Sequence, residues 1–121
     1  MEGGRKILSI GVDIESVDRF KEHDKNGSFL KRIFTNKELE YCFSFTDFAQ
    51  HLAVRYSGKE AVVKALSSVN EETVDYKEIE ILNNDKGAPF VKLNNKNFEG
   101  LEIKISLSHC DDKVIAFVVI I

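Results

Sequence analysis

Four charged residues of this 121-residue chain are spaced in a way that could support chemistry on phosphates. Asp13 and Glu15 end an alternating apolar run, and Glu60 and Lys64 lie four positions apart in a stretch rich in Ala, Val, Lys and Glu. A hard divalent cation such as Mg2+ takes one or two protein carboxylates and fills its other positions with water and phosphate oxygens. Asp13 and Glu60 would suit such an ion.

The stretch around Glu60 has the spacing of a helix surface. Arg55 and Lys59 are four residues apart, as are Glu60 and Lys64, so each pair lines up along one side of a helix. A plain alternative is a solvated ion pair between Glu60 and Lys64. Gly58 argues against that alternative, because glycine inside a helix costs about 1 kcal/mol relative to alanine. It indicates close approach by another element or by a ligand.

The two N-terminal carboxylates have an alternative of their own, in which Asp13 caps a following helix. If the strand continues as far as Glu15, the two carboxylates share a face of it. If a helix begins at Glu15, they diverge.

A third candidate is His109, at the end of the alternating run 103–109. It could donate to a phosphate, or it could hold the turn that follows through its ring nitrogens. Cys110 is beside it, but adjacent residues of a strand point to opposite faces, so we do not expect a nucleophilic dyad.

The N-terminal half is expected to be mostly helical after one strand. Residues 7–14 alternate, with Leu8, Ile10, Val12 and Ile14 on one face of a strand and Ser9, Gly11 and Asp13 on the other. Short helical patterns follow over 15–34, interrupted near Asn26 and Gly27, then a capping box at 35–38 and one long helix over 47–67.

The C-terminal half is expected to be mostly sheet. Four β-branched or alternating segments at 79–82, 90–93, 101–107 and 114–121 are separated by turns, notably at 83–87 and 110–113. The chain is therefore predicted to be one α+β domain, 1–121, with helices packed on an antiparallel sheet. Residues 114–121 are apolar on both faces, which predicts a homo-oligomer in which a neighbouring subunit covers one of them.

Composition excludes several classes of protein. With 43% hydrophobic and 31% charged residues the chain should fold, and a net charge of -3 argues against nucleic acid or an anionic membrane as partner. Two distant cysteines, Cys42 and Cys110, suggest neither a disulfide framework nor a zinc site. The N-terminus lacks an export signal, and the longest apolar run is far short of the ~20 residues of a membrane helix, so a cytoplasmic location is expected.

Five fragments, in order, resemble the holo-(acyl carrier protein) synthase type of 4'-phosphopantetheinyl transferase. They are Gly11-Val12-Asp13-Ile14, Phe34-Thr35-x-x-Glu38-Leu39, Arg55-Tyr56-x-x-Lys59-Glu60-Ala61-x-x-Lys64-Ala65, Gly87-Ala88-Pro89 and Ile105-Ser106-Leu107-Ser108-His109. Two departures are Ala88, where many members have Lys or Arg, and Glu15, which is similar to a metal-site glutamate of the double-length transferases.

The resemblance implies an activity that supports fatty acid biosynthesis. The phosphopantetheine arm of coenzyme A would pass to a serine of apo acyl carrier protein, and adenosine 3',5'-bisphosphate would leave. The implied site residues are Asp13 and Glu60 on Mg2+, Glu60 and Lys64 in catalysis, and Lys64, Arg55, Lys59, His109 and Pro89 on the substrate. The general base, Glu60 or a metal-bound water, stays open.

The resemblance also implies a trimer with sites between protomers, and docking of the acidic carrier on cations. Residues 15–37 hold six cations against four acids, and Arg19 is the best docking candidate among them. Two other classes of function remain open, a non-catalytic protein that binds an acyl carrier and a metal-dependent hydrolase of nucleotide diphosphates.

Overall fold

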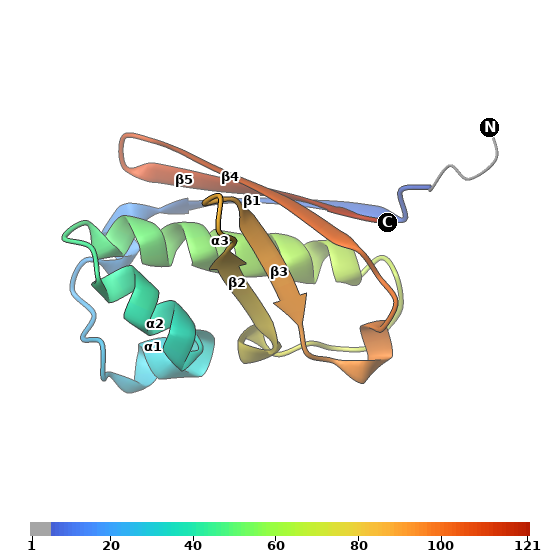
Figure 1. Ribbon diagram of the computed structural model, residues 1–121, viewed down its shortest axis with the longest axis horizontal. Coiled ribbons are helices and arrows are strands. Elements are labelled where there is room, and N and C mark those ends of the chain that lie inside the picture. The colour runs from blue at the N-terminus through green and yellow to red at the C-terminus, as the bar shows by residue number, and fades with distance from the viewer. Residues whose placement is uncertain (1–5) are drawn as a thin grey trace.

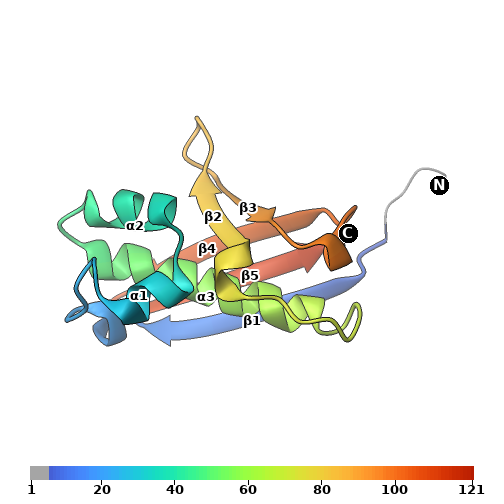
Figure 2. The same ribbon diagram turned by 90° about the horizontal axis from the view of Figure 1, so that it is seen from below.

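The computed structural model describes residues 6–121 and has a long central helix between two layers (Figures 1 and 2). One layer is a three-stranded antiparallel sheet, in the order β1-β5-β4. The other contains two short helices and the antiparallel hairpin β2-β3. The elements are β1 (Ser9–Ser16), η1 (Val17–Phe20), α1 (Ser28–Ile33), α2 (Asn36–Phe43), α3 (Phe48–Leu66), η2 (Tyr76–Glu78), β2 (Ile79–Asn83), β3 (Pro89–Leu93), η3 (Lys96–Phe98), β4 (Ile103–Cys110) and β5 (Lys113–Ile120).

Strand β1 lies directly against α3, because small residues let the two backbones approach. A Cβ at Gly11 would be 2.1 Å from the carbonyl oxygen of Ala61, so only glycine fits there. Two serine hydroxyls bridge the gap, with Ser57 Oγ donating to the Asp13 carbonyl at 2.8 Å and Ser9 Oγ to the Ala65 carbonyl at 2.7 Å. The strand is thus held in place along the helix.

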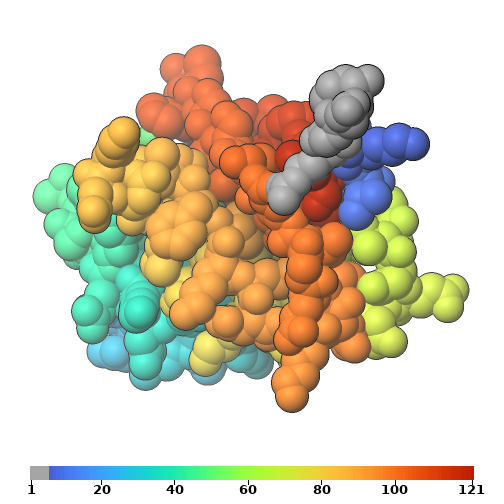
Figure 3. Space-filling view, turned by 45° about the vertical axis from the view of Figure 1, so that its right-hand side comes forward, coloured from blue at the N-terminus to red at the C-terminus, as the bar shows by residue number. Residues whose placement is uncertain are grey.

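Gly58 on the same helix faces two other strands. A Cβ there would be 2.5 Å from Ile81 Cδ1 of β2 and 3.2 Å from Ile105 Cδ1 of β4. Of the two explanations for this glycine, close packing of other elements is therefore correct and a ligand is not needed. The hairpin and the segment after it, coloured gold and orange, fill the middle of the face seen in Figure 3.

Most predicted elements are confirmed. The capping box before α2 is present, with Thr35 Oγ1 accepting from the Glu38 amide at 3.3 Å and Glu38 Oε1 accepting from the Thr35 amide at 2.9 Å. The long helix and the two C-terminal hairpins lie where they are expected, and Asp111 in the second turn has a φ of 55°.

Three features of the fold differ from expectation. The strands form two sheets rather than one. Strand β1 runs to Ser16, beyond the predicted end at residue 14, because it pairs along its whole length with β5. Over 15–34, the predicted helical segments reduce to η1 and the six-residue α1.

The outer face of the three-stranded sheet is apolar and uncovered. Ile10, Val12 and Ile14 are 50 to 62% exposed, and Ile115 and Phe117 of β5 are 40 and 44% exposed. Cross-strand pairing puts Val12 beside Phe117 and Ile14 beside Ile115. Within residues 6–121 nothing lies over this face, which is the upper side of the sheet in Figure 1. In the same described part, no helix has the length and hydropathy to span a membrane.

Candidate active site

Three carboxylates meet where β1 passes over α3. Asp13, Glu15 and Glu60 each offer one oxygen, and these oxygens lie within 4.8 Å of one another. Asp13 and Glu15 share a face because β1 continues through both, which answers the question that the sequence left open. Asp13 does not act as a helix cap, since the residue that precedes η1 is Ser16.

Lys64 completes this cluster from the next turn of α3. Its ammonium lies 3.0 Å from Asp13 Oδ1 and 3.1 Å from the Val12 carbonyl, and its side chain is 56% exposed. Among the ion pairs of residues 6–121, Lys64 is joined to Asp13 and not to Glu60. The solvated Glu60–Lys64 pair considered from the spacing is therefore wrong.

The cluster has more negative charge than its neighbours neutralise. Burial, and then the Asp13 carboxylate beside it, raise the pKa of Glu15 from 4.5 to about 7, although Arg19 Nη1 lies 3.1 Å from Glu15 Oε1 and opposes the shift. A proton or a bound cation would relieve this repulsion.

The donor set fits Mg2+. Asp13 is only 8% exposed, and its Oδ2 is buried with no hydrogen-bond partner among the described residues. A buried carboxylate oxygen in that condition is costly unless something binds it. Carboxylate oxygens are also the ligands that this hard cation prefers. Asp13, Glu15 and Glu60 are therefore suitable ligands.

Sequence reasoning missed two tyrosines beside the cluster. Tyr76, which opens η2, donates its hydroxyl to Glu60 Oε1 at 2.7 Å, and burial together with this bond raises the pKa of Tyr76. The guanidinium of Arg19 lies over the ring of Tyr56, 4.8 Å from its centroid. Tyr76 stands in a short turn without periodicity, so no pattern could have pointed to it.

A second group of predicted residues lines a pocket of about 470 Å³. Arg55, Pro89 and His109 belong to it, together with His51, which the sequence analysis did not select. Neither Asp nor Glu is among the described residues that line it, so the pocket favours an anion. Burial lowers the pKa of His51, and Arg55 adds to the shift by repulsion.

Arg55 is held rigidly in this pocket. Its Nη2 donates to Asn83 Oδ1 at 2.5 Å, its Nε donates to the Ile81 carbonyl at 3.3 Å, and the guanidinium carbon lies 4.4 Å from the centroid of the Tyr41 ring. Its residue exposure is 3%. Such a guanidinium is preorganised to meet an anionic group with little further loss of side-chain freedom.

The two groups lie on different flanks of the molecule. Arg55 and Glu60 are five positions apart on α3, which separates their directions by about 140° around the helix. In the sheet, β5 separates β1, which carries Asp13, from β4, which carries His109. One chain therefore brings together Asp13, Glu60 and Lys64, and separately Arg55, Pro89 and His109.

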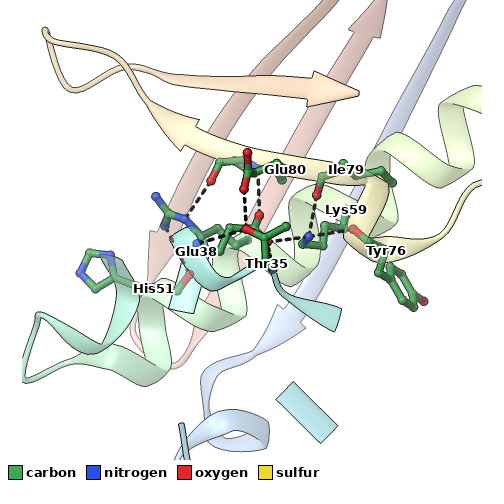
Figure 4. Close-up of polar contacts among 9 residues, drawn as sticks. Thr35, Glu38, His51, Lys59, Tyr76, Ile79 and Glu80 are labelled. Carbon is green, nitrogen blue, oxygen red and sulfur yellow. Dashed lines mark hydrogen bonds and ion pairs between the residues drawn. The ribbon is translucent and has the colours of Figure 1, made fainter. Parts of the chain in front are cut away.

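Lys59 belongs to neither group, although the resemblance implied a role for it in substrate binding. Its side chain has no exposed surface, and its ammonium lies 2.8 Å from Glu38 Oε1, 2.8 Å from the Tyr76 carbonyl and 2.5 Å from the Ile79 carbonyl (Figure 4). All three ammonium protons have acceptors inside the protein, so none remains for a ligand. Adjacent helix positions point about 100° apart, which sends Lys59 into the core and Glu60 toward the cluster.

Comparison with known proteins shows the family to which the chain belongs. The model of the 4'-phosphopantetheinyl transferase superfamily matches residues 9–118, so the chain belongs to this superfamily. Its similarity extends to the holo-[acyl-carrier-protein] synthase type, as the sequence motifs predicted. Over 116 residues it is 42% identical to the holo-[acyl-carrier-protein] synthase of Thermodesulfovibrio yellowstonii, covering 94% of this chain and 98% of the relative. The synthase of Aquifex aeolicus is also 42% identical, over 113 residues, covering 88% and 93%.

Solved structures show the same fold. The holo-[acyl-carrier-protein] synthase of Neisseria meningitidis has a TM-score of 0.79 at 29% identity, covering 95% of this chain and 98% of that one. The synthase of Helicobacter pylori in complex with coenzyme A has a TM-score of 0.77 at 27% identity, covering 92% and 98%. The α+β class predicted from the sequence is confirmed.

Proposed function

We propose that this protein transfers the 4'-phosphopantetheine arm of coenzyme A to a serine of apo acyl carrier protein and releases adenosine 3',5'-bisphosphate. The observation that carries the proposal is the buried Asp13 Oδ2, which has no hydrogen-bond partner among residues 6–121 and lies in a three-carboxylate cluster beside Lys64, in a chain of this superfamily. Holo carrier protein is the form that carries acyl chains in fatty acid biosynthesis, and we propose that the protein works there, in the cytoplasm.

Asp13 and Glu60, with Glu15 beside them, would hold Mg2+ against the coenzyme A pyrophosphate. The bound ion would neutralise charge on the phosphate oxygens, which is the main requirement when a diphosphate is cleaved. The Lys64 side chain is 56% exposed, and its ammonium has one proton beyond those directed at Asp13 and Val12 with which to contact the same phosphates. Glu60 has one oxygen engaged by the Tyr76 hydroxyl, and the proton of the attacking serine would pass either to Glu60 or to a water beside it.

The nucleotide end of coenzyme A would occupy the pocket of Arg55, Pro89 and His109. Its lining is free of acids among the described residues and its arginine is preorganised, as a phosphorylated ribose requires. Because this pocket and the carboxylate cluster lie on different flanks of one chain, we propose that a complete site combines the cluster of one protomer with the pocket of another.

The uncovered face of the three-stranded sheet supports a homo-oligomer, which we propose to be a trimer. Its apolar side chains on β1 and β5 are neighbours in the sheet, and a patch of this kind on a small domain marks an interface. Arg19, 48% exposed at its side chain and next to the cluster, is the proposed contact for the acidic carrier.

Mass spectrometry of the carrier tests the proposal. The pure protein, coenzyme A, Mg2+ and an apo acyl carrier protein should give a carrier heavier by one phosphopantetheine, and omission of Mg2+ or a Glu60→Gln substitution should prevent the addition. Incubation without a carrier should leave coenzyme A intact. Cleavage of coenzyme A alone would instead indicate a hydrolase, and carrier binding that survives both Glu60→Gln and metal removal, without any transfer, would indicate a non-catalytic binder.

A further inference from the structure

Tyr76 is hydrogen-bonded to two consecutive residues of α3, Lys59 and Glu60, through two different atoms of its own. Its hydroxyl donates to Glu60 Oε1 at 2.7 Å, and its carbonyl accepts from Lys59 Nζ at 2.8 Å. Lys59 and Glu60 point in different directions from the helix, so the segment that carries Tyr76 wraps around its side. Figure 4 shows Lys59 reaching the Tyr76 carbonyl, while the phenol ring extends away from the buried contacts.

The Lys59 end of this arrangement is rigid. Lys59 also binds the Ile79 carbonyl at 2.5 Å and Glu38 Oε1 at 2.8 Å, and Glu38 in turn accepts from the amides of Thr35 and Ile81. Lys59 and Glu38 have no exposed side-chain surface. A fully bonded buried network of this kind fixes the backbone to which it is attached, here both ends of η2.

The Glu60 end needs such support. Glu60 has three side-chain torsions and faces Asp13 and Glu15 across less than 5 Å, so repulsion between like charges would turn its carboxylate away. A hydroxyl donor bonded to one Glu60 oxygen offsets this repulsion and keeps the carboxylate beside Asp13 and Glu15. Tyr56 lies behind Tyr76, with ring centroids 5.7 Å apart, and limits movement of the phenol.

We propose that Tyr76 is a positioning residue for the carboxylate cluster, and that buried Lys59 acts on Glu60 through Tyr76. The inference rests on the proposed function. It gives a physical reason for Lys59 beside Glu60 in the helix motif: Glu60 touches the reacting groups, while Lys59 fixes the turn that orients Glu60.

The test is the affinity for Mn2+ without coenzyme A or carrier, measured by electron paramagnetic resonance on wild-type protein and on Tyr76→Phe. The substitution removes one oxygen and keeps the ring. We expect Mn2+ to bind about tenfold more weakly, the low end of what loss of an outer hydrogen bond costs a metal site. In the transfer assay the Mg2+ concentration for half-maximal rate should rise by a similar factor, with most of the rate recovered at saturating Mg2+. Lys77→Gln, an exposed neighbour in η2, is the control and should change neither value.

The Lys59 step is tested in the same measurement. Lys59→Met should weaken Mn2+ binding in the wild type but have no further effect in Tyr76→Phe, because its influence passes through Tyr76. If Lys59→Met does not fold, Lys59→Met with Glu38→Met removes both buried charges and takes its place.

Two results would overturn the inference: a folded Tyr76→Phe with wild-type Mn2+ affinity, or additive losses from Lys59→Met and Tyr76→Phe. Either can occur in an enzyme whose wild type transfers phosphopantetheine. A wild type that binds Mn2+ tightly and transfers nothing would instead contradict the proposed function, while weaker Mn2+ binding by Tyr76→Phe would still support the positioning of Glu60.

Discussion

At the scale of single residues, the two carboxylate oxygens of Asp13 have very different surroundings. One of its oxygens is paired with Lys64 and the other is buried without a partner among the described residues. Asp13→Asn keeps the shape but removes the charge that would hold a cation. We expect transfer to fall roughly hundredfold or more, while the thermal midpoint without metal stays equal or rises because repulsion with Glu15 is relieved.

The assay is carrier mass against time, with calorimetry of the same samples. Ser57→Ala, which removes the hydroxyl bond to the Asp13 backbone but no charge, is a control for displacement of β1. Near-normal rates for Asp13→Asn at low Mg2+ would show that Asp13 does not hold the metal.

The two cysteines should differ sharply in reactivity. Burial raises the pKa of the Cys42 thiol to about 12, whereas Cys110 is exposed at the turn between β4 and β5. At pH 8 a thiol-disulfide reagent should modify one thiol per folded chain quickly and the second only after unfolding, since the thiolate is the reactive form. Cys110→Ser should remove the fast phase and Cys42→Ser should not. Fast modification of two thiols in folded wild type would contradict the buried position of Cys42.

Sequence reasoning placed the residues proposed to meet a ligand better than the residues that support them. Asp13, Glu60 and Lys64 converge as the family motifs implied, because strand and helix periodicity place them on known faces. Lys59 belongs to the same motif but is buried in an ion pair with Glu38. Glu38 lies in another helix, and periodicity within one helix cannot predict a contact between two helices. Tyr76 has no periodic context at all.

At the scale of elements, the Lys59–Glu38 pair joins α3 to the start of α2 and to β2. Lys59→Met leaves the Glu38 carboxylate buried and without its cation, so we expect the free energy of unfolding in urea to fall by about 3 to 5 kcal/mol. Lys104→Met removes an exposed lysine paired with Glu102 in the sheet and should change it by about 1 kcal/mol or less. Equal losses of unfolding free energy in the two variants would mean that the buried pair stabilises the fold no more than an exposed pair does.

The boundaries of helices and strands were predictable where neighbouring residues in the sequence determine them. They were not predictable where pairing with a distant strand determines them. The capping box alone determines the start of α2, and the turn at 83–87 determines the first hairpin. The end of β1 depends instead on β5, which lies far along the chain and pairs with β1 as far as Ser16, opposite Lys113. That extension places Glu15 on the same face as Asp13, so a non-local pairing decides how many carboxylates the cluster has.

At the scale of the whole molecule, the proposed division of the site between protomers would make activity depend on oligomeric state. If the carboxylate cluster of one protomer works with the Arg55 pocket of another, the protein must assemble in order to act. The apolar run at the C-terminus predicted an uncovered face. The alternation in β1 predicted two faces but not which of them is buried. In the structure Asp13 lies on the buried face, so Ile10, Val12 and Ile14 join the uncovered one.

Phe117 lies on the central strand of that face and is 44% exposed, so Phe117→Asp should place a charge in the middle of the proposed interface. We expect light scattering after size exclusion to give about three times the 13.7 kDa chain mass for the wild type and one chain mass for the variant. Transfer should fall together with assembly, although Phe117 belongs neither to the carboxylate cluster nor to the residues that line the pocket.

Phe90→Asp is the matched control, because Phe90 is 40% exposed on the other sheet, and it should leave mass and transfer unchanged. A monomeric Phe117→Asp that kept its transfer rate would show that a single chain holds a complete site, and the division of the site between protomers would then be wrong.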